Sequence, residues 1–191
     1  MQRRMRNDQI EYWLNPTPEN LPHTYLTDNG RSDMLVDTVK NKIALATNRA
    51  ILEIGCNVGR NLSYLEMAGY TNLCGIDVND KALDMVQSNA CLMHGPIEAV
   101  LPRILPPYGL VFTMAVLQHI PPENDKVFED VARLGRYNLL TIEDEGCIST
   151  RHFPRNYKEV FEGLGMKQIR AWRNLIDLSK SFVMRWFKER E

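Results

Sequence analysis

Apolar runs of strand length alternate with helix-length segments along most of this chain. Five such runs, at residues 50–55, 72–77, 91–93, 109–116 and 137–142, are each followed by a polar, glycine- or proline-containing stretch or by a segment with helical spacing. Two further strand-like runs, 167–172 and 182–187, close the chain with no clear helix between them. This order predicts an α/β fold: a doubly wound, mostly parallel seven-stranded sheet with helices on both faces and an antiparallel hairpin at one edge.

Apolar spacing and capping residues place the helices. We expect helices over 32–45, 59–68, 80–89, 123–134 and 156–164, with Ser32 capping the first and Asp80 the third. A short helix over 7–14 should end at the proline-rich residues 15–18. Residues 1–31 are therefore expected to form an N-terminal extension, and residues 32–191 a single domain.

Charge and cysteine content narrow the class of protein. The formal net charge is −1 and the charges are interleaved, so nothing draws the chain to polyanions, which argues against nucleic-acid binding. The longest apolar stretch, around 109–117, is too short to cross a bilayer. The four cysteines, Cys56, Cys74, Cys91 and Cys147, form no C-x-x-C pair and predict free thiols, no metal site and a cytoplasmic location.

A glycine-rich turn follows the first predicted strand. Gly55 and Gly59 allow a tight turn and let a ligand approach the backbone closely. The helix that begins near Gly59 offers free amide donors to a carboxylate or phosphate. Glu53, just before the turn, suits an amino or cationic group better than a phosphate.

A carboxylate ends the second predicted strand. In an open parallel sheet the ligand crevice lies beyond the carboxyl ends of the strands. Asp77 stands at that edge, and an ionised carboxylate can accept hydrogen bonds from both hydroxyls of a ribose. Together with the glycine turn, Asp77 indicates a ligand with a ribose and a charged tail resembling an amino acid.

Four motifs in this order resemble those of class I S-adenosylmethionine-dependent methyltransferases. Residues 53–59 (Glu-x-Gly-x-Asn-x-Gly) resemble that family's first motif, an acidic residue followed by alternating glycines. Gly75-Ile76-Asp77 resembles the second motif, residues 95–102 the segment that passes the adenine, and residues 111–120 the fourth motif. The resemblance covers about residues 32–189 and implies a Rossmann-like fold with S-adenosylmethionine as cofactor.

The resemblance also implies roles for individual residues. Gly55, Cys56, Asn57 and Gly59 would line the methionine part of the cofactor, with Glu53 beneath it, and Asp77 would hold the ribose. Val78 would pack on the adenine, with Ile97 and Glu98 on its other side, and Met114 and Ala115 would present backbone near the amino group. Arg31 would reach the cofactor carboxylate. The full set expected at the cofactor is Arg31, Glu53, Gly55, Cys56, Asn57, Gly59, Asn61, Asp77, Val78, Ile97, Glu98, Met114 and Ala115.

Two positions depart from the family pattern. Asn57 replaces the middle glycine, although asparagine tolerates a left-handed backbone better than most residues. Pro96 stands where many relatives carry an acid for the adenine amino group, which leaves that contact to Glu98 or to a backbone carbonyl.

Candidate catalytic residues follow the fourth and fifth strands. His119 can act as a general base on the acceptor or can simply cap a turn before Pro121. Glu143, with Asp144 and Glu145, forms a cluster that can contact a substrate or lie in a solvated loop. The basic and aromatic residues that follow, Arg151, His152, Arg155 and Tyr157, can bind an anionic acceptor or serve as surface and capping residues.

These observations predict a methyltransferase that acts on an oxygen or nitrogen atom of a small or medium-sized acceptor. The N-terminal extension, with Trp13, Tyr25 and Arg31, is expected to fold over the cofactor as a helical lid. Two alternatives stay open: a protein or RNA methyltransferase, and a non-catalytic module that binds the cofactor. The sequence does not identify the acceptor or the oligomeric state.

Overall fold

The computed structural model describes residues 2–27, 30–105 and 107–190. Its strands form one seven-stranded sheet in the order β3-β2-β1-β4-β5-β7-β6. Strands β1 to β5 pair in parallel, whereas β7 is antiparallel to both β5 and β6. The expected fold class is confirmed, including the antiparallel hairpin at one edge. The strands are β1 (Ile51–Ile54), β2 (Leu73–Asp77), β3 (Cys91–His94), β4 (Leu110–Met114), β5 (Leu139–Asp144), β6 (Met166–Trp172) and β7 (Phe182–Glu189).

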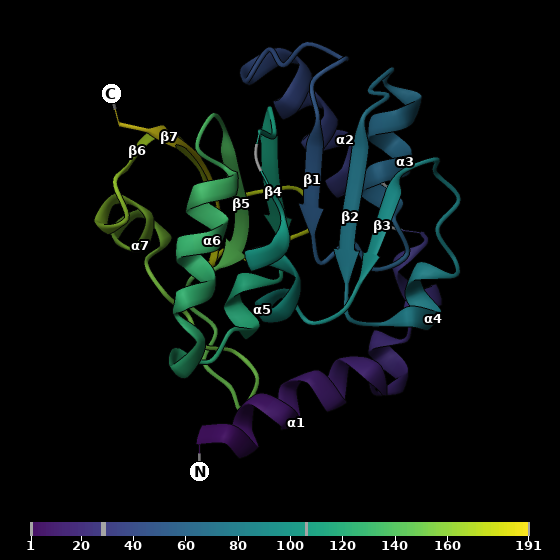
Figure 1. Ribbon diagram of the computed structural model, residues 1–191, viewed down its shortest axis with the longest axis vertical. Helices are drawn as coiled ribbons and strands as arrows, with labels where there is room; N and C mark the ends of the chain where they lie inside the picture. The colour runs from purple at the N-terminus through teal and green to yellow at the C-terminus, as the bar shows by residue number, and fades with distance from the viewer. Residues whose placement is uncertain (1, 28–29, 106, 191) are drawn as a thin grey trace.

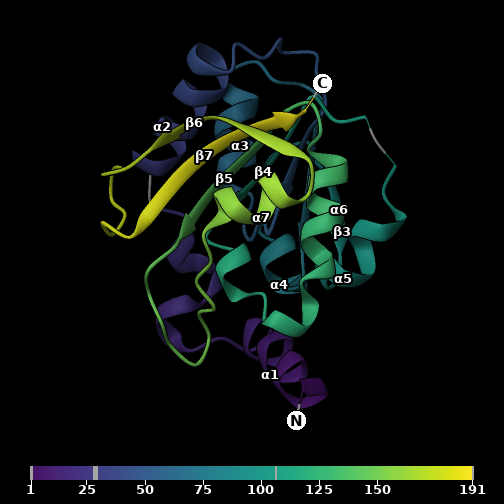
Figure 2. The ribbon, with the colours of Figure 1, turned by 90° about the vertical axis from the view of Figure 1, so that its left-hand side faces the viewer.

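Helices cover both faces of the sheet (Figures 1 and 2). The α-helices are α1 (Gln2–Leu14), α2 (Gly30–Asp37), α3 (Arg60–Met67), α4 (Asp80–Leu83), α5 (Ile97–Val100), α6 (Lys126–Leu134) and α7 (Tyr157–Gly163). A π-helical segment, η3 (Thr38–Lys42), extends α2, and 3₁₀ turns occur at η1 (Pro18–Asn20), η2 (Pro22–Tyr25), η4 (Leu101–Arg103), η5 (Leu117–His119) and η6 (Pro122–Asn124). Within the described residues, no helix is both long and apolar enough to cross a membrane.

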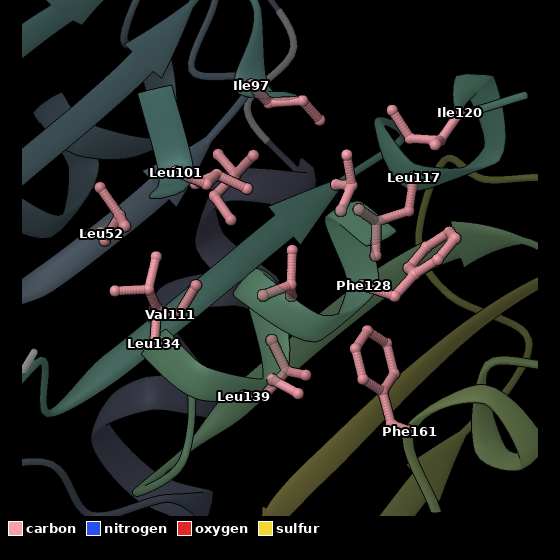
Figure 3. Packing of buried hydrophobic residues seen from close by; sticks show 14 of the residues in the cluster. Leu52, Ile97, Leu101, Val111, Leu117, Ile120, Phe128, Leu134, Leu139 and Phe161 are labelled. Carbon is pink, nitrogen blue, oxygen red and sulfur yellow. The ribbon is translucent and has the colours of Figure 1, made fainter. Parts of the chain in front are cut away.

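Two apolar cores stabilise the sheet, one on each face. On one face, Leu52 and Val111 of the sheet pack with residues of α5, α6 and α7, including Phe128 and Phe161 (Figure 3). On the other face, side chains of α2 and α3 such as Leu35 and Leu62 pack against the strands. Burial of the central strands on both faces explains why their sequences are continuous apolar runs instead of alternating ones.

Two predicted helix caps are wrong. Ser32 lies inside α2, where its hydroxyl donates to Asn61 Oδ1 over 2.8 Å, because the helix already begins at Gly30. Asn79, not Asp80, caps α4, since its side chain accepts from the amide of Ala82 over 3.1 Å. The predicted helix over 80–89 is also shorter, ending at Leu83.

The N-terminal helix is longer than expected and lies across the carboxyl ends of the parallel strands (Figure 1). Ligands bind at these strand ends in this architecture. The fold therefore gathers α1 and the loops after β1, β2 and β4 around one region.

Candidate functional site

The turn after β1 has the left-handed backbone that its sequence indicated. Gly55, Asn57 and Gly59 have φ angles of 76°, 49° and 68°. A Cβ on Gly55 would lie 2.4 Å from Cγ2 of Val116, so this position has no room for a side chain. Gly59 precedes α3, and a Cβ there would lie 2.6 Å from Cγ1 of Val86. The glycines thus let the turn pack tightly against its neighbours, and the asparagine tolerates the conformation that the missing glycine would favour.

Asp77 joins the turns that follow β1 and β2. Its two carboxylate oxygens accept from the amides of Asn57 over 2.8 Å and of Asn79 over 2.9 Å. Burial raises the pKa of Asp77, while the bonds from these backbone amides act in the opposite direction. Each oxygen keeps acceptor capacity for a further hydroxyl.

Glu53 is a buried acid with one free oxygen. Its Oε1 accepts from Asn61 Nδ2 over 2.7 Å, whereas Oε2 is buried without a hydrogen-bond partner among the described residues. Burial raises its pKa to about 8, although the Asn61 bond and the charge of Arg60 act to lower it. A cationic or amino group placed against Oε2 would satisfy this oxygen and favour the ionised acid.

The buried side chain of Glu143 accepts hydrogen bonds from the backbone of the loop after β4. Ala115 has a left-handed backbone, with φ 57°. Oε2 of Glu143 accepts from the amides of Val116 over 2.9 Å and of Gln118 over 3.3 Å. The side chain is fully buried and does not line the cavity, and burial raises its pKa to about 7. The prediction that Glu143 contacts the substrate is therefore not supported by its position, since it lies under the loop.

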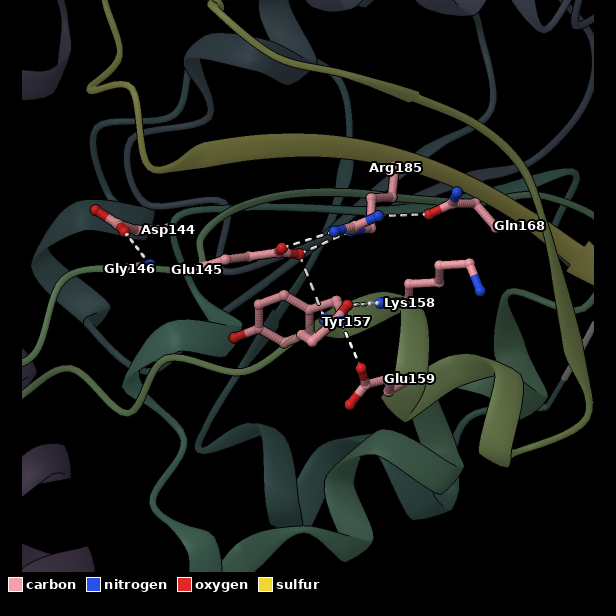
Figure 4. Close-up of polar contacts among 9 residues, drawn as sticks. Asp144, Glu145, Gly146, Tyr157, Lys158, Glu159, Gln168 and Arg185 are labelled. Carbon is pink, nitrogen blue, oxygen red and sulfur yellow. Dashed lines mark hydrogen bonds and ion pairs between the residues drawn. The ribbon is translucent and has the colours of Figure 1, made fainter.

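The neighbouring acids turn away from Glu143 to separate partners. Asp144 Oδ1 accepts from the amides of Gly146 and Cys147, both over 2.9 Å, and so closes the turn after β5. Glu145 forms a two-bond ion pair with Arg185 of β7, each bond 2.7 Å long (Figure 4). The three acids are therefore separate structural contacts and not one cluster.

α1 is fixed over the site by polar contacts in its C-terminal half. Asn79 Nδ2 donates to the carbonyl of Trp13 over 2.7 Å, and Gln9 Nε2 donates to the carbonyl of Thr150 over 3.3 Å. The guanidinium of Arg151 lies 4.1 Å from the centre of the Tyr12 ring. These contacts link the helix to the turn after β2 and to the loop after β5.

His119 lies beneath α1. Its ring centre is 5.0 Å from that of Trp13 and 4.7 Å from that of His152. Nδ1 lies 2.7 Å from the carbonyl oxygen of Arg151, and because a carbonyl only accepts, Nδ1 carries the proton. Burial lowers the pKa of His119 to about 4, so the ring is neutral at physiological pH with Nε2 as a hydrogen-bond acceptor.

These residues enclose one cavity of about 540 Å³. Of the residues expected at the site, Gly59 and Glu143 do not line it. Those that do are Arg31, Glu53, Gly55, Cys56, Asn57, Asn61, Asp77, Val78, Ile97, Glu98, Met114, Ala115 and His119.

Sequence reasoning missed several lining residues. Gln9 and Ile10 come from α1, and Asn79 and Gln118 come from turns beside the predicted motifs. Asn79 was detectable in principle, because it follows Asp77 closely at the same sheet edge. Nothing local marks Gln9, since its place depends on a contact with Thr150 far along the chain.

Comparisons with known proteins agree with this geometry. A family model described as a methyltransferase domain matches residues 51–137. No curated protein matches the chain. Magnesium protoporphyrin IX methyltransferase from Synechocystis PCC 6803 with bound S-adenosylmethionine is similar in structure, with a TM-score of 0.72 and 14% identity over 97% of both chains. A TehB-like methyltransferase from Corynebacterium glutamicum has a TM-score of 0.67 and 16% identity over 100% of both chains.

Residues 51–137 thus match a methyltransferase domain, and the chain has the fold of the S-adenosylmethionine-dependent methyltransferases to which it is similar. S-adenosylmethionine, which is bound in the Synechocystis enzyme, also fits the residues present in the cavity. Glu53 Oε2 is buried in the cavity wall with no hydrogen-bond partner among the described residues. Asp77 offers a carboxylate with spare acceptor capacity, and Gly55 lines the cavity without a side chain.

Proposed function

We propose that this protein transfers a methyl group from S-adenosylmethionine to an oxygen or nitrogen atom of a small or medium-sized acceptor. The observation that carries the proposal is the single cavity that joins the glycine turn and Asp77 to a second group of side chains. That second group includes Trp13, His119 and His152, which come from α1 and from the loops after β4 and β5. Its volume of about 540 Å³ is typical of small-molecule sites.

One end of the cavity would hold the cofactor. Asp77 would accept from the ribose hydroxyls, and Glu53 would bind the amino group through Oε2. Val78 and Ile97 would flank the adenine, and Glu98, which already accepts from Asn124 over 2.7 Å, lies beside them in the cavity wall. The remaining contacts would come from Arg31, Cys56, Asn57, Asn61, Met114 and Ala115.

The other end would orient the acceptor. The bound cofactor supplies a methyl group already activated on a sulfonium, so the protein mainly has to align the nucleophile with it. His119, neutral and with Nε2 as an acceptor, would receive a hydrogen bond from an O–H or N–H group of the acceptor. Trp13 packs edge-on against the His119 ring and would help to exclude water.

The cover formed by α1 supports a small acceptor over a macromolecule. α1 is hydrogen-bonded to the turn after β2 and to the loop after β5. It therefore covers the carboxyl ends of the strands, where a protein or RNA acceptor would have to dock (Figure 1). The cysteines, all free among the described residues, also support our proposal of a cytoplasmic location.

A two-step experiment tests the proposal. Calorimetric titration with S-adenosylhomocysteine should show binding, and tritiated methyl transfer in a cell extract should then label the low-molecular-weight fraction. His119→Asn should reduce labelling while leaving S-adenosylhomocysteine binding intact. Label in the polymer fraction would instead indicate a macromolecular acceptor, and binding without labelled product would indicate a non-catalytic module.

A further inference from the structure

Two cysteines face each other across the edge of the sheet, away from the cavity. Cys74 of β2 and Cys91 of β3 are register partners on neighbouring parallel strands. Neighbouring strands lie about 4.8 Å apart, which is within the Cα separation of roughly 4.4–6.8 Å that a disulfide spans. The next pair on the same face is Ile76 and Met93, both of which contact the same apolar core. The two thiols therefore lie on one side of the sheet.

The surroundings of the pair assign different roles to its two members. Cys91 is exposed, so a solute can reach it directly, whereas Cys74 is half-buried. The two thiols interact with each other, and the hydroxyl of Tyr108 contacts Cys74. Burial, together with the sulfur of Cys74, raises the pKa of Tyr108 to about 12, which keeps its hydroxyl protonated and able to donate to that sulfur.

The other two cysteines lack this arrangement. Cys147 is exposed but has no thiol beside it among the described residues. Cys56 is buried in the core on the opposite face, where its sulfur would lie 2.7 Å from a Cβ placed on Gly75. The pair on β2 and β3 thus combines an accessible thiol with a second thiol in reach.

We propose that Cys74 and Cys91 form a dithiol site that reacts reversibly with low-molecular-weight disulfides such as oxidised glutathione. The thiolate of Cys91 attacks one sulfur of the small disulfide, whose S–S bond breaks and releases one thiol, leaving a mixed disulfide on Cys91. Cys74, as its thiolate, then attacks Cys91 Sγ and displaces the second small thiol. In total, two protein thiols lose two electrons and two protons, and the small disulfide gains them.

The position of β3 allows the disulfide between Cys74 and Cys91 to form. β3 is an edge strand of four residues, and among the described strands it pairs only with β2. It can therefore shift toward β2 without disturbing a second partner strand. Burial and the neighbouring Cys91 raise the pKa of Cys74, so the second step should accelerate as the pH rises. The proposal does not depend on the acceptor or on methyl transfer.

Peptide mapping of the full chain tests the site. The protein is incubated with oxidised glutathione at mildly alkaline pH, blocked with N-ethylmaleimide and digested with trypsin. Cleavage after Arg60, Lys81 and Arg103 places Cys74 in the peptide 61–81 and Cys91 in the peptide 82–103. The native protein should yield these two peptides linked to each other, and the link should disappear after treatment with dithiothreitol.

Matched variants and an internal control make the result decisive. Cys147 should keep a glutathione adduct, because it has no partner to displace it. Cys74→Ser should make Cys91 keep its adduct in the same way, and Cys147→Ser should leave the linked pair unchanged. The proposal is overturned if Cys91 of the wild-type protein retains glutathione as Cys147 does, if both thiols stay alkylated, or if the link forms equally fast in concentrated urea.

Discussion

At the level of single residues, the Asp77 carboxylate contributes both to the local fold and to the cavity wall. It joins the turns after β1 and β2 through the amides of Asn57 and Asn79, and it also borders the cavity. Loss of the carboxylate would therefore loosen the turn that shapes the site and also remove the contacts that we propose to a bound nucleoside. A hydrogen bond to a charged group contributes roughly 1.5–3 kcal/mol.

We expect Asp77→Ala to weaken binding of S-adenosylhomocysteine about 10- to 100-fold, since each 1.4 kcal/mol corresponds to a factor of about ten. Calorimetric titration measures the change. Asp84→Ala is the matched control, because Asp84 is an exposed acid that does not line the cavity, and it should bind normally. Unchanged affinity in Asp77→Ala would contradict the assignment of the ribose-binding acid.

Individual residues also show how far local sequence patterns reach. The sequence places Glu53 within the first apolar run and Asp77 at the end of the second, and both line the cavity. Their contacts to a cofactor stay predictions. Glu143 also comes at the end of an apolar run. However, its side chain accepts hydrogen bonds from the amides of the loop after β4 and does not line the cavity. The direction of a side chain at a strand end depends on how the next loop folds, and the sequence does not show this.

The elements around the site differ in how they are held. Strands β1, β2 and β4 are fixed by the cores on both faces, whereas α1 is fixed by a few polar contacts, such as Asn79 with Trp13 and Gln9 with Thr150. An element with few buried apolar contacts opens locally at low cost. α1 is therefore the element that we expect to respond to ligand.

Binding of S-adenosylhomocysteine should protect amides in residues 10–35 from hydrogen exchange, because α1 and the turns after it line the cavity. Exchange measured by mass spectrometry with and without ligand tests this. In the free protein, Asn79→Ser should speed exchange in α1 about fivefold, since serine can still cap α4 but cannot reach Trp13, and one neutral bond contributes about 1 kcal/mol. Equal exchange in this segment with and without ligand would refute the lid.

A buried ion pair joins the loop after β5 to the neighbouring antiparallel strand β7. Glu145 and Arg185 are joined by two bonds of 2.7 Å, their side chains are 11% and 7% exposed, and Arg185 also donates to Gln168 over 2.6 Å (Figure 4). Removing one partner of such a pair leaves the other charge buried and unpaired.

We expect Arg185→Met to cost roughly 3–5 kcal/mol of unfolding free energy, because Glu145 would lose its partner. The double variant Arg185→Met with Glu145→Gln should recover part of this loss, since no charge then stays buried. Urea unfolding of the three proteins measures both effects. A single variant as stable as the wild type would show that the pair contributes little.

At the scale of the whole molecule, three of the buried acids near the carboxyl ends of the parallel strands have raised pKa values. Burial raises the pKa of Glu53 to about 8 and of Glu143 to about 7, and it also raises the pKa of Asp77. An acid whose pKa is higher in the folded than in the unfolded chain makes the folded state less stable as the pH rises through that interval. For Glu53 the interval runs from its ordinary value of 4.5 to about 8.

The free protein should therefore lose stability as the pH rises from about 5 to about 8. His119, whose pKa is lowered to about 4, opposes this loss below its ordinary value of 6.5, but the two glutamates outweigh it. Glu53→Gln should flatten this dependence in part, because Glu143 and Asp77 still contribute. Thermal unfolding across this pH range tests the prediction, with Glu129→Gln, an exposed glutamate of α6, as control. If the unfolding temperatures of Glu53→Gln and of the wild type change equally with pH, then Glu53 does not change its protonation on folding.

The overall architecture was predictable because the sequence patterns that indicate it are local and repeat along the chain. Continuous apolar runs fixed the positions of β1, β2, β4 and β5 to within a few residues, and the order of elements set the sheet. The shape of the site was less predictable, because its roof is assembled from distant segments. The contact of Gln9 with Thr150 joins parts of the chain 141 residues apart, and no local pattern encodes it.

The position of α1 has a practical consequence for handling the protein. Gln2 begins the helix that roofs the cavity, whereas Glu189 ends β7 near the opposite pole of the molecule (Figure 1). An affinity tag fused ahead of α1 would extend the helix whose C-terminal half lines the cavity. Purification handles, surface immobilisation and fluorescent reporters belong at the carboxyl terminus.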